Sequence, residues 1–441
     1  MRSSLPKVLH PLRGLPIIEH AVRTIVQATG QKPLIVVGAD AGLVRAVIGE
    51  RAEYAVQADA LGTGHAVMQA EIALRGDPAQ QFIITAADMP LVRPETLQRL
   101  AAERERSGAA IVMLTVLVND PRGFGRVVRD AAGNVRAVVE EVACTPEQLR
   151  ISELNGAIYC IEAAWLWGAL RRIQPNPRKG EYFLTDLVEI AVADGRTVRA
   201  IGGDDIDECI GINTRVDLAD ADAALRRRIN RAHMLNGVSI VDPATTYIDL
   251  DVLIGADTTI LPNCHLLGGT RIGTGSTIGP DTLLRDSIVG DNCDIRQSVL
   301  EGAQVDEGAS AGPFSHLREG SHVGRGAHVG NFGEMKKSTL GAHSKMGHFG
   351  YLGDATVGEG VNIGAGAVTC NYDGVRKNPT TIGDGAFIGS DTMLVAPVEV
   401  GANATTGAGA VVTKNVPPDS VAVGLPARVI RRKAPKGGAS S

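Results

Sequence analysis

Residues 253–279 read LIGADTTILPNCHLLGGTRIGTGSTIG, and this stretch decides the fold of the second half of the chain. An aliphatic residue recurs at every sixth position, and most of these residues are followed by glycine. The register comprises Ile254, Ile260, Leu266, Ile272 and Ile278. A period of six fits neither a helix nor an alternating strand. It indicates hexapeptide repeats, in which the aliphatic side chain points inward and glycine tolerates the tight turn that follows.

The same spacing returns further along the chain. The later registers are Val323 and Val329, then Val357 and Ile363, then Ile382, Ile388, Leu394 and Val400. Three hexads make one triangular coil, and stacked coils bury a continuous core. We therefore predict a left-handed parallel β-helix from about residue 250 to about residue 425. A flexible glycine-rich segment is the alternative, but such linkers lack a phased aliphatic ladder.

The first half has a different pattern, in which aliphatic runs alternate with helix-like stretches. The runs are PLIVVGAD (33–40), QQFIITAADMP (80–90) and AAIVMLTVLV (109–118). This alternation predicts a doubly wound α/β domain. The segment that follows, TRVDLADADAALRRRINRAHMLNG from Thr214, has apolar residues along one helix face and three solvated arginines at 226–228, so it predicts a helical arm. We expect an α/β domain at 1–213, a helical linker at 214–236, and the β-helix with a C-terminal tail at 237–441.

Composition narrows the functional classes. The chain has 441 residues, and its 44 basic and 49 acidic residues give a net charge of −5. This balance gives no reason to expect a nucleic acid or an anionic membrane as partner. No apolar run reaches the roughly 18 residues of a membrane span. The six cysteines contain no C-x-x-C pair, so we expect reduced thiols without a metal cluster in a cytoplasmic protein.

Two motifs in the first half suggest binding chemistry. QADALGTGHA begins at Gln57, and its Gly-Thr-Gly turn opens a helix whose free N–H groups could hold a base edge or a phosphate. ITAADMP places Asp88 at the carboxyl end of a strand, where open α/β sheets bind ligands. One carboxylate with nucleotide phosphates can hold Mg²⁺. Taken alone, a plain helix start and a turn cap explain the two motifs about equally well.

Polar and charged side chains interrupt the hexads of the second half. They are Arg318, Lys336, His348, Tyr351, Asn362 and Lys377. Because coils stack, such residues can converge at one groove although they are distant in sequence. A single histidine in a β-helix turn is more often a solvated turn residue.

The order of the motifs is more informative than any one of them. LPKVLHPLRGLPIIEHA, QADALGTGHA, AADMPL, GFGRVVR, VVEE, LNGAIY, GEYFLTDL and GIN follow one another along the first half. Together they resemble the family of bacterial bifunctional N-acetylglucosamine-1-phosphate uridyltransferases/glucosamine-1-phosphate acetyltransferases. The resemblance extends from residue 1 to about residue 430.

For the first half, the resemblance implies uridylyl transfer from UTP to N-acetylglucosamine-1-phosphate, with Mg²⁺ as cofactor. It implies UTP-binding roles for Lys7, Gln57, Gly62 and Thr63. It implies N-acetylglucosamine-1-phosphate contacts for Gly125, Glu140 and Asn155, and metal-ligand roles for Asp88 and Asn213. The sugar-1-phosphate oxygen would attack the α-phosphorus of UTP in line, and pyrophosphate would leave.

For the second half, the resemblance implies acetyl transfer from acetyl-CoA to glucosamine-1-phosphate, with His348 as the catalytic base. It implies glucosamine-1-phosphate contacts for Arg318, Lys336, Tyr351, Asn362 and Lys377. It implies acetyl-CoA contacts for Ala365, Asn371, Tyr372, Ser390, Ala408 and Arg428. Gly333, Phe349 and Gly350 differ from the commoner family segments NFVEMKKS and HLTYLGD.

Family members begin with a strand and the loop Leu-Ala-Ala-Gly-x-Gly-Thr-Arg-Met, and Met1 resembles the last residue of that loop. From this we expect the chain as written to acetylate well and to transfer uridylyl groups poorly. One alternative is an acetyltransferase with an inactive first half. Others are a nucleotidyltransferase whose β-helix only regulates and oligomerises, and a non-catalytic scaffold. Triangular β-helices of this kind usually form trimers, so we expect a homotrimer.

Overall fold

The computed structural model describes residues 1–38, 41–118, 123–177 and 179–432. The chain forms two compact units, Met1–Leu225 and Arg226–Ser441. The boundary lies inside helix α7 (Arg215–Leu235). The end of the expected tail, residues 433–441, lies outside the described part of the chain.

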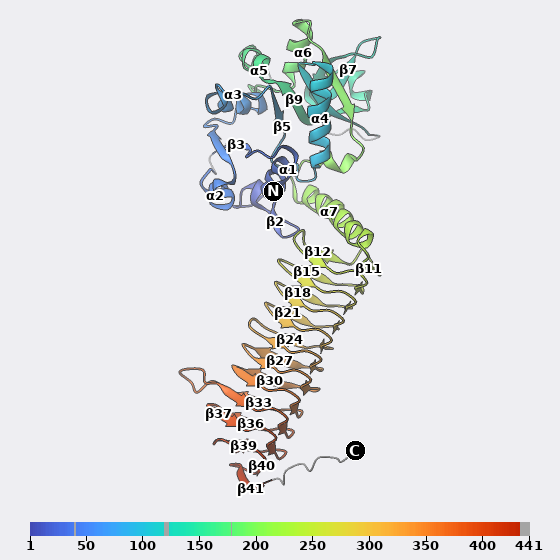
Figure 1. Ribbon diagram of the computed structural model, residues 1–441. Helices are drawn as coiled ribbons and strands as arrows, with labels where there is room; N and C mark the ends of the chain where they lie inside the picture. The colour runs from blue at the N-terminus through green and yellow to red at the C-terminus, as the bar shows by residue number, and fades with distance from the viewer. Residues whose placement is uncertain (39–40, 119–122, 178, 433–441) are drawn as a thin grey trace. The chain divides into compact units, whose positions relative to one another are not determined.

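The first unit combines short strands with helices (Figure 1). The helices are α1 (Ile17–Thr29), α2 (Ala41–Ile48), α3 (Thr63–Leu74), α4 (Pro94–Ser107), α5 (Ala163–Leu170) and α6 (Asp186–Ala193), with 3₁₀ turns η1 (Lys7–Leu9), η2 (Gly49–Arg51), η3 (Glu141–Ala143), η4 (Gln148–Arg150) and η5 (Ile206–Cys209). The strands are β1 (Pro11–Leu12), β2 (Leu15–Pro16), β3 (Leu34–Val37), β4 (Glu53–Val56), β5 (Gln81–Ile84), β6 (Ile111–Leu117), β7 (Arg126–Arg129), β8 (Val135–Val139), β9 (Glu153–Glu162) and β10 (Val198–Gly202). None of the helices in the described residues is long and apolar enough to cross a membrane.

The main sheet of this unit has the order β10-β6-β9-β7-β8, and β5 also pairs with β9. Strand β6 is parallel to β10 and antiparallel to β9. The three aliphatic runs form β3, β5 and β6 as expected, but the sheet is mixed because β9 runs against its neighbours. Strands β3 and β4 form a separate parallel pair.

Helices cover both faces of this sheet, as a doubly wound domain requires. On one face, Ile111 and Met113 of β6 pack in a cluster with residues of α5 and α6. On the other face, Val112 and Leu114 pack with Leu97 and other residues of α4. Successive residues of a strand point to opposite faces, so both sets of side chains are covered and β6 is buried from Ile111 to Val116.

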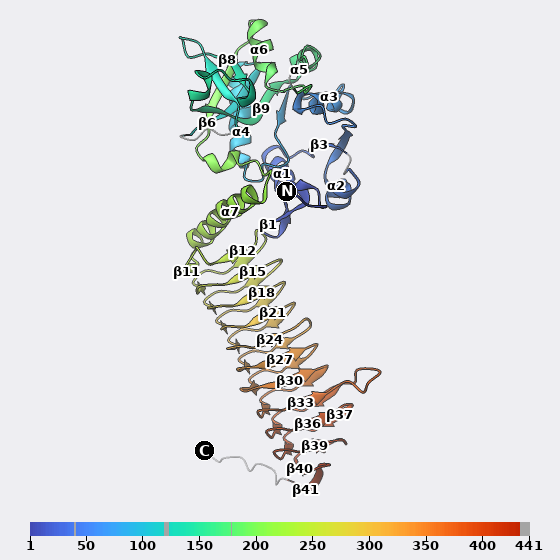
Figure 2. The ribbon, with the colours of Figure 1, turned by 180° about the vertical axis from the view of Figure 1, so that it is seen from behind.

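The second unit is a left-handed parallel β-helix with three flat sheets, seen as a column of coils in Figures 1 and 2. The twelve-stranded sheet contains β11 (Ser239–Ile240), β14 (Thr259–Ile260), β17 (Thr277–Ile278), β20 (Asp294–Ile295), β23 (Ser310–Ala311), β26 (His328–Val329), β29 (Lys345–Met346), β32 (Asn362–Ile363), β35 (Phe387–Ile388), β38 (Thr405–Thr406), β40 (Ser420–Val423) and β41 (Arg428–Arg432). The ten-stranded sheet contains β12 (Tyr247–Ile248), β15 (His265–Leu267), β18 (Leu283–Arg285), β21 (Val299–Glu301), β24 (His316–Leu317), β27 (Gly333–Lys336), β30 (Gly350–Gly353), β33 (Val368–Cys370), β36 (Met393–Val395) and β39 (Val411–Val412). The nine-stranded sheet contains β13 (Leu253–Ile254), β16 (Arg271–Ile272), β19 (Ile288–Val289), β22 (Gln304–Val305), β25 (His322–Val323), β28 (Thr339–Leu340), β31 (Ala355–Val357), β34 (Thr380–Ile382) and β37 (Val398–Val400).

The hexad aliphatic residues form the core of this unit. With the exception of Ile254, the hexad residues named from the sequence are at most 5% exposed, among them Ile272, Ile278, Val323, Val329, Ile382 and Ile388. Inward residues stack in register, so that Ile260 lies beside Ile278 and Ile363 beside Ile388. Ile254, in the first strand of its sheet, is only partly buried.

One segment leaves the regular coil. Residues 371–379 separate β33 from β34, and Figure 1 shows a loop projecting from the column at this level. An antiparallel bridge between Tyr372 and Lys377 closes the base of the loop. The loop therefore carries several of the acetyl-site candidates away from the flat faces.

Candidate active sites

Three candidates from distant parts of the first unit meet at one point. The Lys7 ammonium lies 2.5 Å from Asp88 Oδ2 and donates to Asn213 Oδ1 at 2.8 Å. Lys7 begins η1, Asp88 follows β5, and Asn213 precedes α7. The resemblance implied a phosphate-binding lysine and two metal ligands, and the fold brings these three residues together.

Backbone contacts fix the two oxygen donors. The N–H of Ile212 donates to the Asp88 carbonyl at 2.9 Å, which ties the loop after β5 to the approach to α7. Asp217 Oδ2 accepts from the N–H groups of Asn213 at 2.9 Å and Thr214 at 2.7 Å. Burial alone raises the pKa of Asp217, but these N–H donors outweigh it and hold the pKa below its usual range.

Sequence reasoning missed Asp217, although the T-x-x-D spacing before α7 resembles a helix capping box. The Thr214 hydroxyl accepts from the N–H of Asp217 at 3.1 Å, which completes the reciprocal pair.

The donor set fits a hard cation. Carboxylate and amide oxygens are ligands that Mg²⁺ accepts, and here both converge on one positive charge, the Lys7 ammonium.

The QADALGTGHA loop packs against GEYFLTD. Gln57 Nε2 donates to the carbonyl of Gly62 at 3.1 Å and lies 3.0 Å from His65 Nδ1. Gly62 has φ of +97°, and a Cβ there would lie 2.7 Å from the carbonyl oxygen of Tyr182, so only glycine fits. The Thr63 hydroxyl accepts from the N–H of Leu184 at 3.1 Å. The two motifs therefore pack directly against each other.

The three sugar-site candidates lie on or next to strands β7, β8 and β9: Gly125 precedes β7, Glu140 follows β8, and Asn155 is in β9. The N–H of Asn155 donates to the carbonyl of Gly125 at 2.9 Å. The buried Asn155 amide donates to the Tyr159 hydroxyl at 2.6 Å. Glu140 Oε1 accepts from the Thr185 hydroxyl at 3.2 Å, which links it to the end of GEYFLTD.

A further carboxyl group next to Glu140 was not singled out from the sequence. Burial, followed by the negative charges of Glu189 and Glu140, raises the pKa of Asp186 to about 6. Because it begins α6 directly after Thr185, it belongs to the same corner of the unit.

In the second unit, three of the glucosamine-1-phosphate candidates lie on successive coils of the ten-stranded sheet, namely Arg318, Lys336 and Tyr351. Leu317 pairs with Met335, so the next residues, Arg318 and Lys336, are neighbours. Lys336 in turn pairs with Gly353. The Arg318 guanidinium donates to Glu334 Oε1 at 3.0 Å.

Asp354 organises the next coil, and sequence reasoning missed it. Its Oδ2 accepts from the Asn371 amide at 2.6 Å and lies 4.0 Å from Lys377 Nζ. A Cβ at Gly353 would lie 2.4 Å from the Tyr351 hydroxyl and 2.6 Å from Asn371 Nδ2. Glycine therefore lets both side chains lie across the backbone, and Tyr351, Asn371 and Lys377 gather around residues 353–354.

The histidine and three acetyl-CoA candidates occupy one column. Met346, Ile363 and Ile388 are register partners on successive coils, and the next coil continues from Phe387 to Thr405. The residues two positions beyond the inward residues of these strands are His348, Ala365, Ser390 and Ala408. Backbone bonds confirm the stacking, because Gly366 N–H donates to Phe349 at 2.7 Å and Gly409 N–H donates to Ser390 at 2.8 Å.

The remaining candidates lie around this column. Tyr372 is exposed on the projecting loop. Arg428, on the exposed strand β41, pairs with Val423, beside the Gly407 that precedes Ala408. Asn362 stands apart, because it points outward from the twelve-stranded sheet and not from the ten-stranded face that carries Lys336 and Tyr351. Within one chain, the fold does not place Asn362 on the face of the other sugar candidates.

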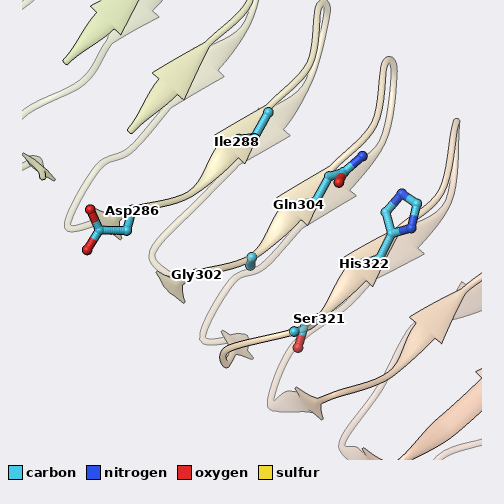
Figure 3. Close-up of a pocket in the computed structure, with 8 residues that line it drawn as sticks. Asp286, Ile288, Gly302, Gln304, Ser321 and His322 are labelled. Atoms are coloured by element: carbon cyan, nitrogen blue, oxygen red, sulfur yellow. The ribbon is translucent and has the colours of Figure 1, made fainter. Parts of the chain in front are cut away.

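A hollow on the nine-stranded face of this unit contains none of these candidates. Figure 3 shows Ile288, Gln304 and His322 projecting side by side from successive coils. His322 Nε2 lies 2.8 Å from Asp306 Oδ2, and Gln304 donates to the same residue at 2.9 Å. These polar groups are paired with one another, and the hollow precedes the coil of His348.

Comparison with known proteins finds similarity in both halves of the chain. The model of the MobA-like NTP transferase domain matches residues 1–145, and that of the bacterial transferase hexapeptide matches residues 251–286 and 379–414. Bifunctional protein GlmU of Trichlorobacter lovleyi is 46% identical over 96% of this chain and 92% of its own length. The protein of the same name from Streptococcus equi subsp. zooepidemicus is 44% identical over 98% and 94%, and that of Exiguobacterium sibiricum is 43% identical over 96% and 94%.

Proposed function

The chain belongs to the family of the bifunctional protein GlmU, and we propose that each of its two activities is carried by one of its two units. It is an enzyme that transfers an acetyl group from acetyl-CoA to glucosamine-1-phosphate. It then transfers a uridylyl group from UTP to N-acetylglucosamine-1-phosphate, which yields UDP-N-acetylglucosamine for cell-wall biosynthesis.

In the first unit, Gln57, Gly62 and Thr63 bind the uridine, and Gly125, Glu140 and Asn155 bind the sugar. The phosphate oxygen of N-acetylglucosamine-1-phosphate attacks the α-phosphorus of UTP, the bond to the β-phosphate breaks, and pyrophosphate leaves. Members of this family use a divalent metal, for which we propose Mg²⁺ held by Asp88 and Asn213. When bound, it neutralises charge that develops on the phosphates.

Lys7 adds a second positive charge at the same place. Its ammonium can reach both oxygen donors, so it is close enough to meet the phosphates that the metal binds. We assign it the role of holding the triphosphate in line, which is a positioning effect as much as an electrostatic one.

In the second unit, His348 takes a proton from the 2-amino group as the nitrogen attacks the acetyl thioester. The carbon–sulfur bond breaks, and CoA leaves as the thiol or thiolate. Arg318, Lys336 and Lys377 hold the sugar phosphate, and Tyr351 holds the sugar. The strongest support for this acetyl site is the column of small residues on the coils that follow His348. Ala365, Ser390 and Ala408 leave room there for an extended pantetheine chain.

We further propose that the enzyme is a homotrimer in the cytoplasm. Asn362 lies on a different face from Lys336 and Tyr351, so it can complete the site of a neighbouring copy. Exposed aromatic rings flank the column on successive coils, namely Phe314, Phe332 and Phe349 at 52%, 60% and 56%. Large exposed apolar side chains in a row are typical of an interaction surface. Sedimentation should give three times the chain mass.

The test of the acetyl site compares Arg318→Ala and Lys336→Ala with Arg271→Ala, which removes an exposed arginine from the nine-stranded face. Loss of a charge-assisted contact should raise KM for glucosamine-1-phosphate by about 10- to 100-fold. KM for acetyl-CoA should change little, and Arg271→Ala should behave as wild type. Equal KM values in all three variants would show that the phosphate binds elsewhere.

A further inference from the structure

Lys7 occupies the point on which the two proposed metal ligands converge. Its ammonium contacts Asp88 Oδ2 and Asn213 Oδ1 at 2.5 and 2.8 Å. A divalent cation that bound both oxygens would need the same space and would be repelled by the ammonium. The lysine and the cation are therefore alternatives at this point.

We infer that Lys7 is a placeholder that holds the metal ligands ready when no divalent cation is bound, and that cation binding releases its ammonium toward the nucleotide phosphates. The inference rests on the proposed function, because it takes Asp88 and Asn213 as the metal ligands. It adds an ordered exchange to that site: Lys7 contacts the two metal ligands first, and it contacts the nucleotide phosphates after the cation has bound.

The contacts of the three residues explain why the lysine, and not the ligands, would move. The backbone of Asp88 is tied to Ile212, and the backbone of Asn213 is tied to Asp217. Lys7 has a long, unbranched side chain that is 35% exposed, whereas the Asp88 side chain is 20% exposed. A flexible ammonium at the edge of a fixed oxygen pair can leave without rearranging the backbone.

The Lys7–Asp88 contact also offsets a cost of partial burial when no metal is bound. An isolated carboxylate loses hydration when it is buried, and a nearby cation compensates for that loss. Lys7 supplies this compensation in the chain alone. The apparent affinity for a divalent cation is therefore lower than the oxygen pair would show if it were free.

The experiment measures Mn²⁺ binding to the full chain without nucleotide, by the loss of the free-ion signal in electron paramagnetic resonance. The variants are Lys7→Met, Asp88→Asn and their combination. Lys32→Met is the matched control, since it removes an exposed positive charge from the same unit outside the site. Circular dichroism spectra verify that every variant is folded.

We expect Lys7→Met to bind one Mn²⁺ about three- to tenfold more tightly than wild type, the range for losing one partly exposed competing charge. Lys32→Met should match wild type, and the double variant should lose the gain. Unchanged affinity in Lys7→Met, or no binding in any variant, would overturn the placeholder role. A gain that survives Asp88→Asn would instead overturn the ligand assignment in the proposed function.

A crystal structure of the wild-type chain with Mn²⁺ alone gives a second readout that does not depend on activity. The anomalous signal should lie between Asp88 and Asn213, with the Lys7 ammonium beyond hydrogen-bond reach of both. Metal bound there while Lys7 keeps its contacts would contradict the exchange.

Discussion

Met346 and Gly333 pack tightly against each other in the β-helix core, and Met346 lies two residues before His348. The Met346 side chain is fully buried inside the β-helix. A Cβ at Gly333 would lie 2.8 Å from Val329 Cγ1 and 2.9 Å from Met346 Cε. Gly350, the register partner of Gly333, has Met346 Sδ 3.6 Å from its own Cβ position. Met346 thus occupies part of the space that a larger residue at 333 would need, whereas at 350 the carbonyl oxygen of Ala367, 2.9 Å from the Cβ position, is the closest obstacle.

These distances give the expected magnitudes. Gly333→Val overpacks the core and should destabilise the second unit by about 1–3 kcal/mol. The Met346 end can move, but Val329 is stiff at χ1, so the strain is not fully relieved. Met346→Ala leaves a cavity and should destabilise by about 2–5 kcal/mol. The double variant adds side-chain volume at 333 and removes it at 346. Its loss of unfolding free energy should therefore be at least about 1 kcal/mol smaller than the sum of the two single losses.

The assay is urea unfolding of the full chain, followed by the loss of acetyl transfer at one fixed protein concentration, because association changes apparent stability. Wild type, both single variants and the double variant complete the cycle. Additivity within about 0.5 kcal/mol would refute the coupling. A neutral Gly333→Val would refute the close packing itself.

Two further predictions concern burial and charge. Ile388→Asp puts an unpaired carboxylate into the fully buried ladder and should destabilise the second unit by several kcal/mol, roughly the penalty for a buried charge. Thr381→Asp, on an exposed outward position of β34, is the control, and equal melting temperatures of the two variants would contradict the inward orientation. Asp186 has a folded-state pKa raised to about 6 by burial and by Glu189 and Glu140, so it favours the folded state most at low pH and loses that contribution as pH rises from about 4 through 6. Asp186→Asn should therefore raise the melting temperature relative to wild type near pH 7.5 but not near pH 4, and a pH-independent difference would contradict this.

The repeat period was sufficient to predict the β-helix, because each hexad contributes one buried residue in a fixed phase. The alternation of runs likewise predicted helices on both faces of the first sheet. It could not predict that β9 runs antiparallel, since a strand buried on both faces looks the same in sequence whichever way it runs.

The residue types and their order identified the candidate sites, but their supporting contacts were not visible in the sequence. Asp354 holds Asn371 and Lys377 only because the loop at 371–379 folds back on the preceding coil. The column from His348 to Ala408 depends on coil lengths that differ, as the spacing between Ile363 and Ile388 demonstrates. Asn362 matched the family motif, yet its strand belongs to another face.

The division of two activities between two units is tested most directly by assaying both reactions on two variants of the full chain. His348→Ala should lower kcat for acetyl transfer by about 10²–10⁴, the usual range for a general base, and leave uridylyl transfer unchanged. Asp88→Asn should do the reverse: pyrophosphate release from UTP and N-acetylglucosamine-1-phosphate should fall below the level measured for the wild-type chain, whatever that level is, and acetyl transfer should stay intact. If either variant lost both activities while remaining folded, or if His348→Ala kept normal acetyl transfer, the assignment of one reaction to each unit would be contradicted.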